Sequence, residues 1–192
     1  MTAHLPFGEI TETMAWTGSG YIDMLEPDPA AIVLLEVATG LSRETRYGGA
    51  ATSVSWPVSQ HSLMAYRFAR DDGVTDETDL RCIFMHDGPE YMIRDLIAPL
   101  KRGCPEYKGI ESRWWRAFAT RFDLPVEMPE IVKHYDNVCG VSEKVALVSP
   151  EAGRWPVFDN VEPRRLPPEL LAMNEKERIQ AFLDAAAELR FT

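Results

Sequence analysis

The sequence is poor in features that would mark a secreted, metal-ribbon or membrane protein. Its three cysteines, Cys82, Cys104 and Cys139, are widely spaced and form no CxxC motif, which favours reduced thiols over a disulfide framework. No apolar run is long enough to span a bilayer, and the first residues, MTAHLPFGEITETM, lack the regions of a signal peptide. We therefore expect a cytoplasmic protein with no membrane partner.

Positive charge is also scarce. Lysine and arginine total 20 against 30 aspartates and glutamates, which gives a formal net charge of −10. Duplex DNA and RNA are bound by clustered lysines and arginines that neutralise phosphates, so we expect no nucleic-acid polymer as a partner. A small phosphorylated substrate remains compatible with this charge if local cations or a metal ion offset the repulsion.

The composition is otherwise that of an ordinary globular protein. The 192 residues are 45% hydrophobic and 26% charged, enough to bury one core. No internal repeat or interdomain linker is visible. We predict a single domain over 1–192, with its core at about 28–148 and a C-terminal loop and helix over 149–192.

Helical spacing dominates the chain, and we predict an all-α fold with a small N-terminal hairpin or loop at 16–28. Residues 42–57 are rich in Gly, Ser and Thr and predict a long loop, and long loops in compact domains tend to be functional. Residues 150–168 carry four prolines and predict an irregular stretch. The predicted helices are 29–41, 58–70, 76–86, a short one between Pro89 and Pro99, 106–122, one from Pro129 whose apolar side includes Ala146, and a last one behind a capping box at Asn174–Glu177.

A histidine and an aspartate stand together where a helix should end. His86 and Asp87 follow the apolar run Ile83–Met85 and precede Gly88-Pro89. Neighbours on a helix do not share a face, but at a helix end both can point at one ion. A buried His-Asp pair without a partner is costly, and metal coordination removes that cost. The alternative is a solvated helix end.

A divalent site needs further donors, usually four to six in total. His61 lies within a predicted helix, and Asp136 lies in the middle of another, beside Val132 and Tyr135. Glu143 follows Asp136 by two helical turns and shares its face. By spacing, His61, His86, Asp87 and Asp136 form a candidate metal site, although a single histidine taken alone is more often an ordinary polar residue than a ligand.

The order His61, then His86-Asp87, then Asp136 resembles the H…HD…D signature of the HD-domain phosphohydrolase superfamily. The resemblance is closest to its YfbR-like 5′-deoxynucleotidase branch and to related small phage proteins, and it covers roughly residues 16–148. Further matching segments are Thr17–Gly20, Pro27–Pro29, Leu41-Ser42, Arg46-Tyr47, Pro57–Ser62, Glu90, Asp95, Pro99–Lys101 and Glu143.

The resemblance implies an all-α HD fold holding one divalent metal ion, with Co, Mn, Zn and Mg all compatible with mixed nitrogen and oxygen ligands. The implied metal ligands are His61, His86, Asp87 and Asp136. The implied catalytic residues are Glu90, which would orient or deprotonate the attacking water, and Asp95, which would contact the sugar or assist acid–base chemistry.

The resemblance also implies a substrate-binding group. Arg46 and Lys101 would meet the phosphate, the first as a planar fork and the second as a point charge. Tyr47 stands where better-known members have Trp or Phe, next to the expected position of the base or sugar. Gly88-Pro89 and Trp56-Pro57 also depart from the family pattern near that position.

The expected function is that of a metal-dependent phosphohydrolase acting on deoxynucleotides. Its simplest form is a 5′-deoxynucleotidase, in which metal-activated water converts a 5′-deoxynucleoside monophosphate to nucleoside and phosphate. The alternatives are a dNTP triphosphohydrolase of the dATP type and a non-catalytic, metal-containing nucleotide-binding module. The presence of Glu90 and Asp95 argues against the binding module, because neither is needed to hold an ion. A homodimer is implied by the resemblance, with the helix 107–122 as a surface that could form its interface.

Overall fold

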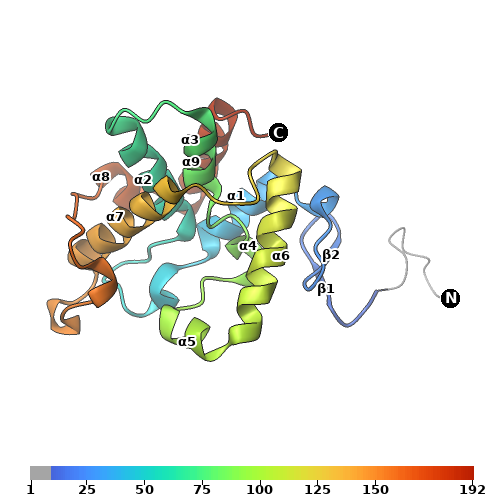
Figure 1. Ribbon diagram of the computed structural model, residues 1–192, viewed down its shortest axis with the longest axis horizontal. Helices are drawn as coiled ribbons and strands as arrows, with labels where there is room; N and C mark the ends of the chain where they lie inside the picture. Colours follow the sequence, from blue (N-terminus) through green and yellow to red (C-terminus); the bar gives the residue numbers. More distant parts are fainter. Residues whose placement is uncertain (1–9) are drawn as a thin grey trace.

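The computed structural model describes residues 10–192, and within them the chain is mostly helical with one two-stranded hairpin (Figure 1). This confirms the predicted fold class at the level of its helical content and N-terminal hairpin. Residues 1–9 lie outside the described residues. The elements are β1 (Met14–Trp16), β2 (Tyr21–Asp23), α1 (Leu34–Arg43), α2 (Val58–Asp71), α3 (Glu77–Met85), α4 (Glu90–Ile93), α5 (Ala98–Gly103), α6 (Pro105–Phe122), α7 (Glu130–Leu147), α8 (Pro168–Ala172) and α9 (Glu175–Glu188).

Helix α2 is the centre of the molecule. It contacts α1, α3, α7 and α9, and every residue from Val58 to Tyr66 is buried. The helix begins directly after Pro57 and ends where Gly73 adopts a φ of 82°, a left-handed conformation that glycine accommodates without strain. The predicted helix 58–70 is confirmed, and its burial carries His61 into the interior.

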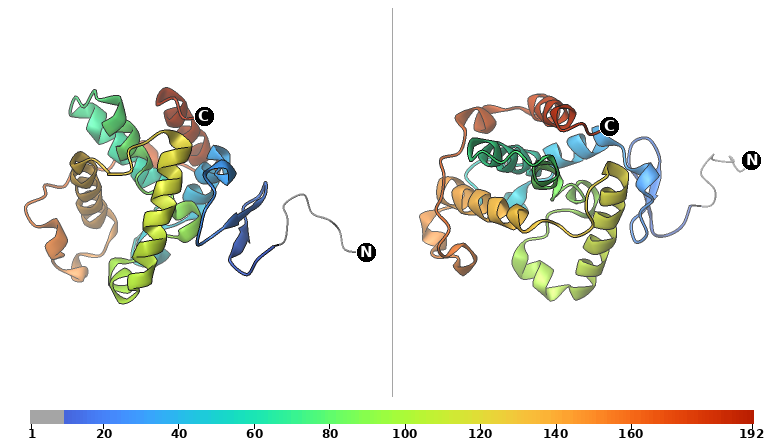
Figure 2. Two further views of the ribbon diagram at one scale, coloured as in Figure 1. Left: turned by 45° about the vertical axis from the view of Figure 1, so that its right-hand side comes forward. Right: turned by 45° about the horizontal axis from the view of Figure 1, so that its top comes forward.

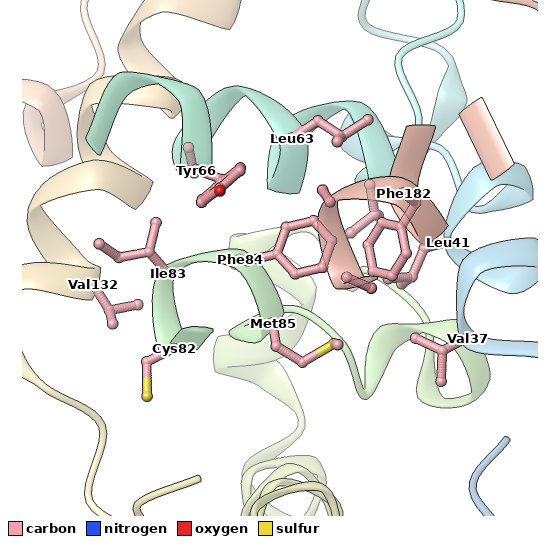
Figure 3. Packing of buried hydrophobic residues seen from close by; sticks show 14 of the residues in the cluster. Val37, Leu41, Leu63, Tyr66, Cys82, Ile83, Phe84, Met85, Val132 and Phe182 are labelled. Atoms are coloured by element: carbon pink, nitrogen blue, oxygen red, sulfur yellow. The ribbon is translucent and has the colours of Figure 1, made fainter. Parts of the chain in front are cut away.

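The C-terminal helix belongs to the same core. The rings of Phe84 on α3 and Phe182 on α9 lie with centroids 4.4 Å apart, and Tyr66 on α2 meets the other side of Phe84 (Figure 3). The capping box predicted at Asn174 and Glu177 is present at the start of α9. Helix α9 contacts α1 and α2 from the outside of the helical bundle (Figure 2), so residues beyond 148 contribute to its packing.

The apolar face of α6 packs against other parts of the same chain. Trp114, Phe118 and Phe122 are buried, and the indole Nε1 of Trp114 donates to the carbonyl of Met24 at 2.9 Å. This is the face that the sequence offered as a dimer interface, so most of it is already covered by the domain itself. The homodimer stays a prediction.

Two predicted helices have different boundaries. Asp28 caps only a 3₁₀ turn at Pro29–Ala31, and α1 begins at Leu34 because Ile32 and Val33 are extended. Likewise α4 ends at Ile93, where Arg94 turns to a φ of 76°.

Pro99 does not end a helix. It lies in the first turn of α5, where its fixed φ fits and its missing N–H is not needed. Ala146 was predicted on the apolar side of α7 but is exposed: it follows the buried Cys139 by two turns on the same side, in the last turn of the helix. No helix among residues 10–192 is long and apolar enough to cross a membrane.

Candidate metal centre and its pocket

His61 is completely buried on α2, and its Nδ1 lies 2.6 Å from Oε1 of Glu143 on α7. Arg46 and His61 lower the pKa of Glu143 to about 2, outweighing the burial that would raise it, so this carboxylate is ionised and can only accept. The proton therefore stands on Nδ1 of His61 and leaves Nε2 with its lone pair.

His86 reaches the same point from the end of α3. Its Nδ1 donates to the carbonyl of Ile83 at 2.8 Å, which again leaves Nε2 as the free acceptor. The Nε2 atoms of His61 and His86 face each other at 3.4 Å. Two lone pairs at that distance repel each other unless a cation lies between them.

Two carboxylates approach the same nitrogens. Oδ1 of Asp136 lies 3.6 Å from Nε2 of His61, and Oδ2 of Asp87 lies 3.6 Å from that atom and 3.4 Å from Nε2 of His86. His61, His86 and Asp136 form a group able to hold a metal ion. Asp87 adds a fourth ligand atom, Oδ2, which also accepts a hydrogen bond from Arg46. Donors bound to one ion at roughly 2.0–2.1 Å lie about 3 to 3.4 Å apart, so this donor set fits a small divalent ion.

The charges around the two histidines favour a cation. Burial and Arg46 oppose a positive charge on His61, but Glu143 and Asp87 outweigh them and raise its pKa. The negative charge of Asp136 is favoured in turn: burial would raise its pKa, but His86, His61 and Arg46 outweigh burial and hold the pKa below its usual range.

Arg46 and Tyr47 hydrogen-bond carboxylates of the candidate centre, and Arg46 links Glu143 to Asp87. They lie in a 3₁₀ turn, Arg46–Gly49, in which Tyr47 has a φ of 60° and the two following glycines are also left-handed. The Nε of Arg46 donates to Glu143 at 3.0 Å and its Nη1 to Asp87 at 3.1 Å, while the Tyr47 hydroxyl donates to Glu143 at 2.7 Å. A tyrosine in left-handed backbone is strained, and such strain is typical of functional turns.

The Gly-Pro sequence after Asp87 has a steric explanation. A Cβ on Gly88 would lie 2.6 Å from the Phe118 ring and 2.8 Å from the carbonyl of Met85, so only glycine fits against α6. The amide of Glu90 donates to the carbonyl of Asp87 at 3.0 Å, which carries the helical turn across Pro89 into α4. The predicted restart of a helix after Pro89 is confirmed, and it places Glu90 beside the centre.

A cavity of about 870 Å³ opens next to these residues. It is lined by Arg46, Tyr47, Ala51, Asp87, Glu90, Asp95, Leu96, Ile97, Ala98, Pro99, Lys101, Arg102, Lys133, Asp136, Trp155, Pro156, Val157 and Phe158. Of the nine site residues predicted from sequence, only His61 and His86 do not line it, and those two lie directly behind Asp87 and Asp136.

The predicted catalytic and phosphate-binding residues differ in how they are held. Oε2 of Glu90 is buried without a hydrogen-bond partner among residues 10–192. Burial, Asp87 and Asp95 raise the pKa of Glu90, and burial followed by Asp87 raises that of Asp95 against the effect of Arg46. Lys101 is ion-paired with Glu111 on α6, so it would have to exchange partners to reach a phosphate.

Sequence reasoning missed two parts of the site. Glu143 was placed on the face of Asp136, but nothing in the sequence indicated that it accepts from His61, Arg46 and Tyr47 at once. The second part is the wall Trp155–Phe158, which comes from the stretch predicted to be irregular. An aromatic pair in an otherwise polar, proline-rich segment was the available signal.

Comparison with known proteins finds relatives without an assigned function. No family model matches the chain. An uncharacterized protein of Rhodobacter capsulatus is 32% identical over 115 residues, which cover 58% of this chain and 59% of that protein. The uncharacterized protein YfdR of Escherichia coli K12 is 28% identical over 141 residues, covering 73% and 74% of the two chains. The matched part thus spans about three fifths of the Rhodobacter relative. The names of the two relatives assign no activity.

Proposed function

We propose that the protein is a metal-dependent phosphohydrolase with an HD-type fold that acts on small deoxynucleotides. The observation that carries the proposal is the pair of Nε2 atoms of His61 and His86, which face each other at 3.4 Å with both Nδ1 atoms committed elsewhere. Histidine ligands of metal ions are oriented in this way, by an acceptor behind the other ring nitrogen.

The residues that would hold the ion are His61, His86, Asp87 and Asp136. A bound divalent ion polarises a phosphoryl oxygen and lowers the pKa of a water ligand, which is the chemistry that hydrolysis of a phosphate ester needs. Arg46 keeps Asp87 and Glu143 in place through two charge-assisted hydrogen bonds and is itself only 13% exposed.

Glu90 is the residue best placed to move a proton. It opens α4 beside Asp87, lines the cavity, and has one carboxylate oxygen without a partner among the described residues. We assign it the proton of the attacking water. Asp95 lines the same cavity and is assigned to the sugar hydroxyl or the leaving oxygen.

The cavity supports a nucleotide as the substrate. Its volume of about 870 Å³ lies in the range of sites for small ligands, and its lining combines cations with the aromatic and apolar residues Trp155–Phe158. A 5′-deoxynucleoside monophosphate, cleaved to nucleoside and phosphate, is the simplest substrate that uses both parts.

A dNTP triphosphohydrolase is the second candidate, favoured by the number of cations. Arg46, Lys101, Arg102 and Lys133 all line the cavity, more than a single phosphate requires. The products separate the two activities, because dAMP would yield inorganic phosphate while dATP would yield inorganic triphosphate.

The proposal is tested by metal analysis together with a nucleotide panel on the purified protein and two variants. We expect Asp87→Ala to lose metal and turnover together, and Glu90→Gln to keep the metal while turnover falls by at least about a hundredfold. Full activity of a metal-free Asp87→Ala protein would end the proposal. Stoichiometric metal with no hydrolysis across the panel would favour the non-catalytic binding module instead.

A further inference from the structure

The cavity is lined by chemically different groups of residues. Beside the carboxylates of the candidate metal centre and the cations, it is lined by four consecutive aromatic or apolar residues, Trp155–Phe158. They comprise Trp155 and the 3₁₀ turn Pro156–Phe158 that it precedes, and they lie outside the segment, 16–148, that resembles the HD superfamily. We call Trp155–Phe158 the aromatic wall.

The aromatic wall is fixed to the helix that carries Asp136. The Phe158 ring packs on Gly140 of α7 so closely that a Cβ there would lie 2.7 Å from its Cζ. A β-bridge between Thr52 and Val148 ties the end of α7 to the loop that also carries Arg46. The wall is therefore held directly by the helix that carries Asp136.

The turn is also closed on itself. Arg154 and Asp159, on either side of the wall, form a two-point ion pair, with Nε donating to Oδ1 at 2.8 Å and Nη2 to Oδ2. The amide of Phe158 donates to the carbonyl of Trp155 at 3.0 Å. A segment held in this way loses little freedom when it binds a ligand, so its contacts contribute to affinity.

Trp155 carries the larger of the two aromatic rings of the wall, and Lys144 lies with its Nζ 5.9 Å from the centroid of that ring. The Trp155 side chain is half-buried, and its ring lies 5.9 Å from Tyr47 and 6.1 Å from Phe158, with the latter nearly parallel. Val157 beside it is 62% exposed. Apolar surface that is held in place yet open to a polar cavity favours a flat, uncharged ring as the ligand group in contact with it.

We propose that Trp155 stacks on the base of the nucleotide and that the aromatic wall determines how well the base is bound. The inference rests on the proposed nucleotide substrate. Arg46 lies 5.6 Å from the centroid of the Tyr47 ring, and that ring lies 5.9 Å from the Trp155 ring. With the phosphate at Arg46 and Lys101, the sugar then lies along Tyr47 and the base reaches Trp155. A stacked aromatic accepts every base, so selectivity among bases comes from the edge contacts and not from Trp155.

The competing explanation is that Trp155 only keeps the turn in place. Kinetics with and without a base separate the two roles. We expect Trp155→Ala to raise the KM for dAMP by roughly ten- to a hundredfold, the range found when a stacking aromatic is removed. It should leave the KM for 2-deoxyribose 5-phosphate within about twofold, and Trp155→Phe should restore most of the affinity for dAMP. Equal losses with both substrates would overturn the assignment, as would an unchanged KM for dAMP.

A binding measurement keeps the test independent of turnover. Tryptophan fluorescence of the metal-free protein, titrated with dAMP, should be quenched in the natural chain and in Trp16→Phe, whose indole lies on the exposed hairpin. The quench should disappear in Trp155→Phe. Quenching that depends on Trp155 in a protein without hydrolase activity would leave the wall assignment standing while the proposed activity falls. Quenching that survives in Trp155→Phe would overturn the wall assignment alone.

Discussion

Glu143 accepts a hydrogen bond from Nδ1 of His61 at 2.6 Å, and this contact determines which nitrogen of His61 faces the candidate metal centre. Replacing Glu143 with glutamine would remove the charge that fixes the imidazole and leave Arg46 with one carboxylate partner fewer. We expect Glu143→Gln to weaken metal binding by about 10- to 100-fold, the usual cost of losing a carboxylate behind a histidine ligand. Competition with a chromophoric chelator would measure it.

The matched control is Glu111→Gln, because Glu111 is ion-paired with Lys101 at the cavity but approaches none of the four proposed ligands. It should bind metal as the natural protein does. Equal affinities of the two variants would contradict the role given to Glu143.

Metal binding should also stabilise the fold, because the four donors come from α2, the end of α3 and α7 and are brought together only by folding. Free metal at a hundred times its dissociation constant stabilises the folded state by about 2.7 kcal/mol. For a chain of this length that raises the midpoint of thermal unfolding by roughly 5–10 °C. Calorimetry with metal and with chelator would test this, with Asp136→Asn as the variant that loses the shift and Asp184→Asn, on an exposed position of α9, as the variant that keeps it.

The two glycines at 88 and 109 offer a matched pair of substitutions. Gly88→Ala would force a Cβ to 2.6 Å from the Phe118 ring and should destabilise the protein by about 1 to 3 kcal/mol. Gly109, inside α6, has only the end of the Arg113 side chain within 4 Å, so alanine there should stabilise by up to about 1 kcal/mol. Urea unfolding would measure both. A neutral Gly88→Ala would show that the turn after Asp87 is looser than described.

The three thiols should differ in reactivity. Cys82 and Cys139 are buried, and burial raises the pKa of the Cys82 thiol to about 11 and that of Cys139 well above its usual range. Because thiolates are the reactive form, both should resist a disulfide reagent at pH 8. We expect the folded protein to release about one equivalent, from Cys104, and the unfolded protein three. Loss of the fast equivalent in Cys104→Ser would confirm its source, and rapid reaction of two thiols in that variant would contradict the burial of the others.

The helices could be predicted from sequence where amphipathic spacing and capping residues agreed, as at Val58–Asp71 and behind Asn174. Prediction was less successful at Pro99, because proline is compatible both with the end of one helix and with the first turn of the next. The candidate site could be predicted from the sequence because His86 and Asp87 are adjacent and Asp136 lies on a helix whose apolar residues keep helical spacing. Glu143 and Trp155 were not assigned, since their roles depend on contacts between segments distant in sequence, such as Phe158 with Gly140.

The contact between Phe158 and Gly140 has a consequence for how this domain can change. The residues proposed to perform the chemistry and those proposed to contact the base are joined through one helix, yet they come from separate stretches of chain. The turn from 154 to 159 could therefore be exchanged for another of similar length, provided that a ring still rests on Gly140. Such exchanges would be a direct route to variants that keep one reaction and accept different bases.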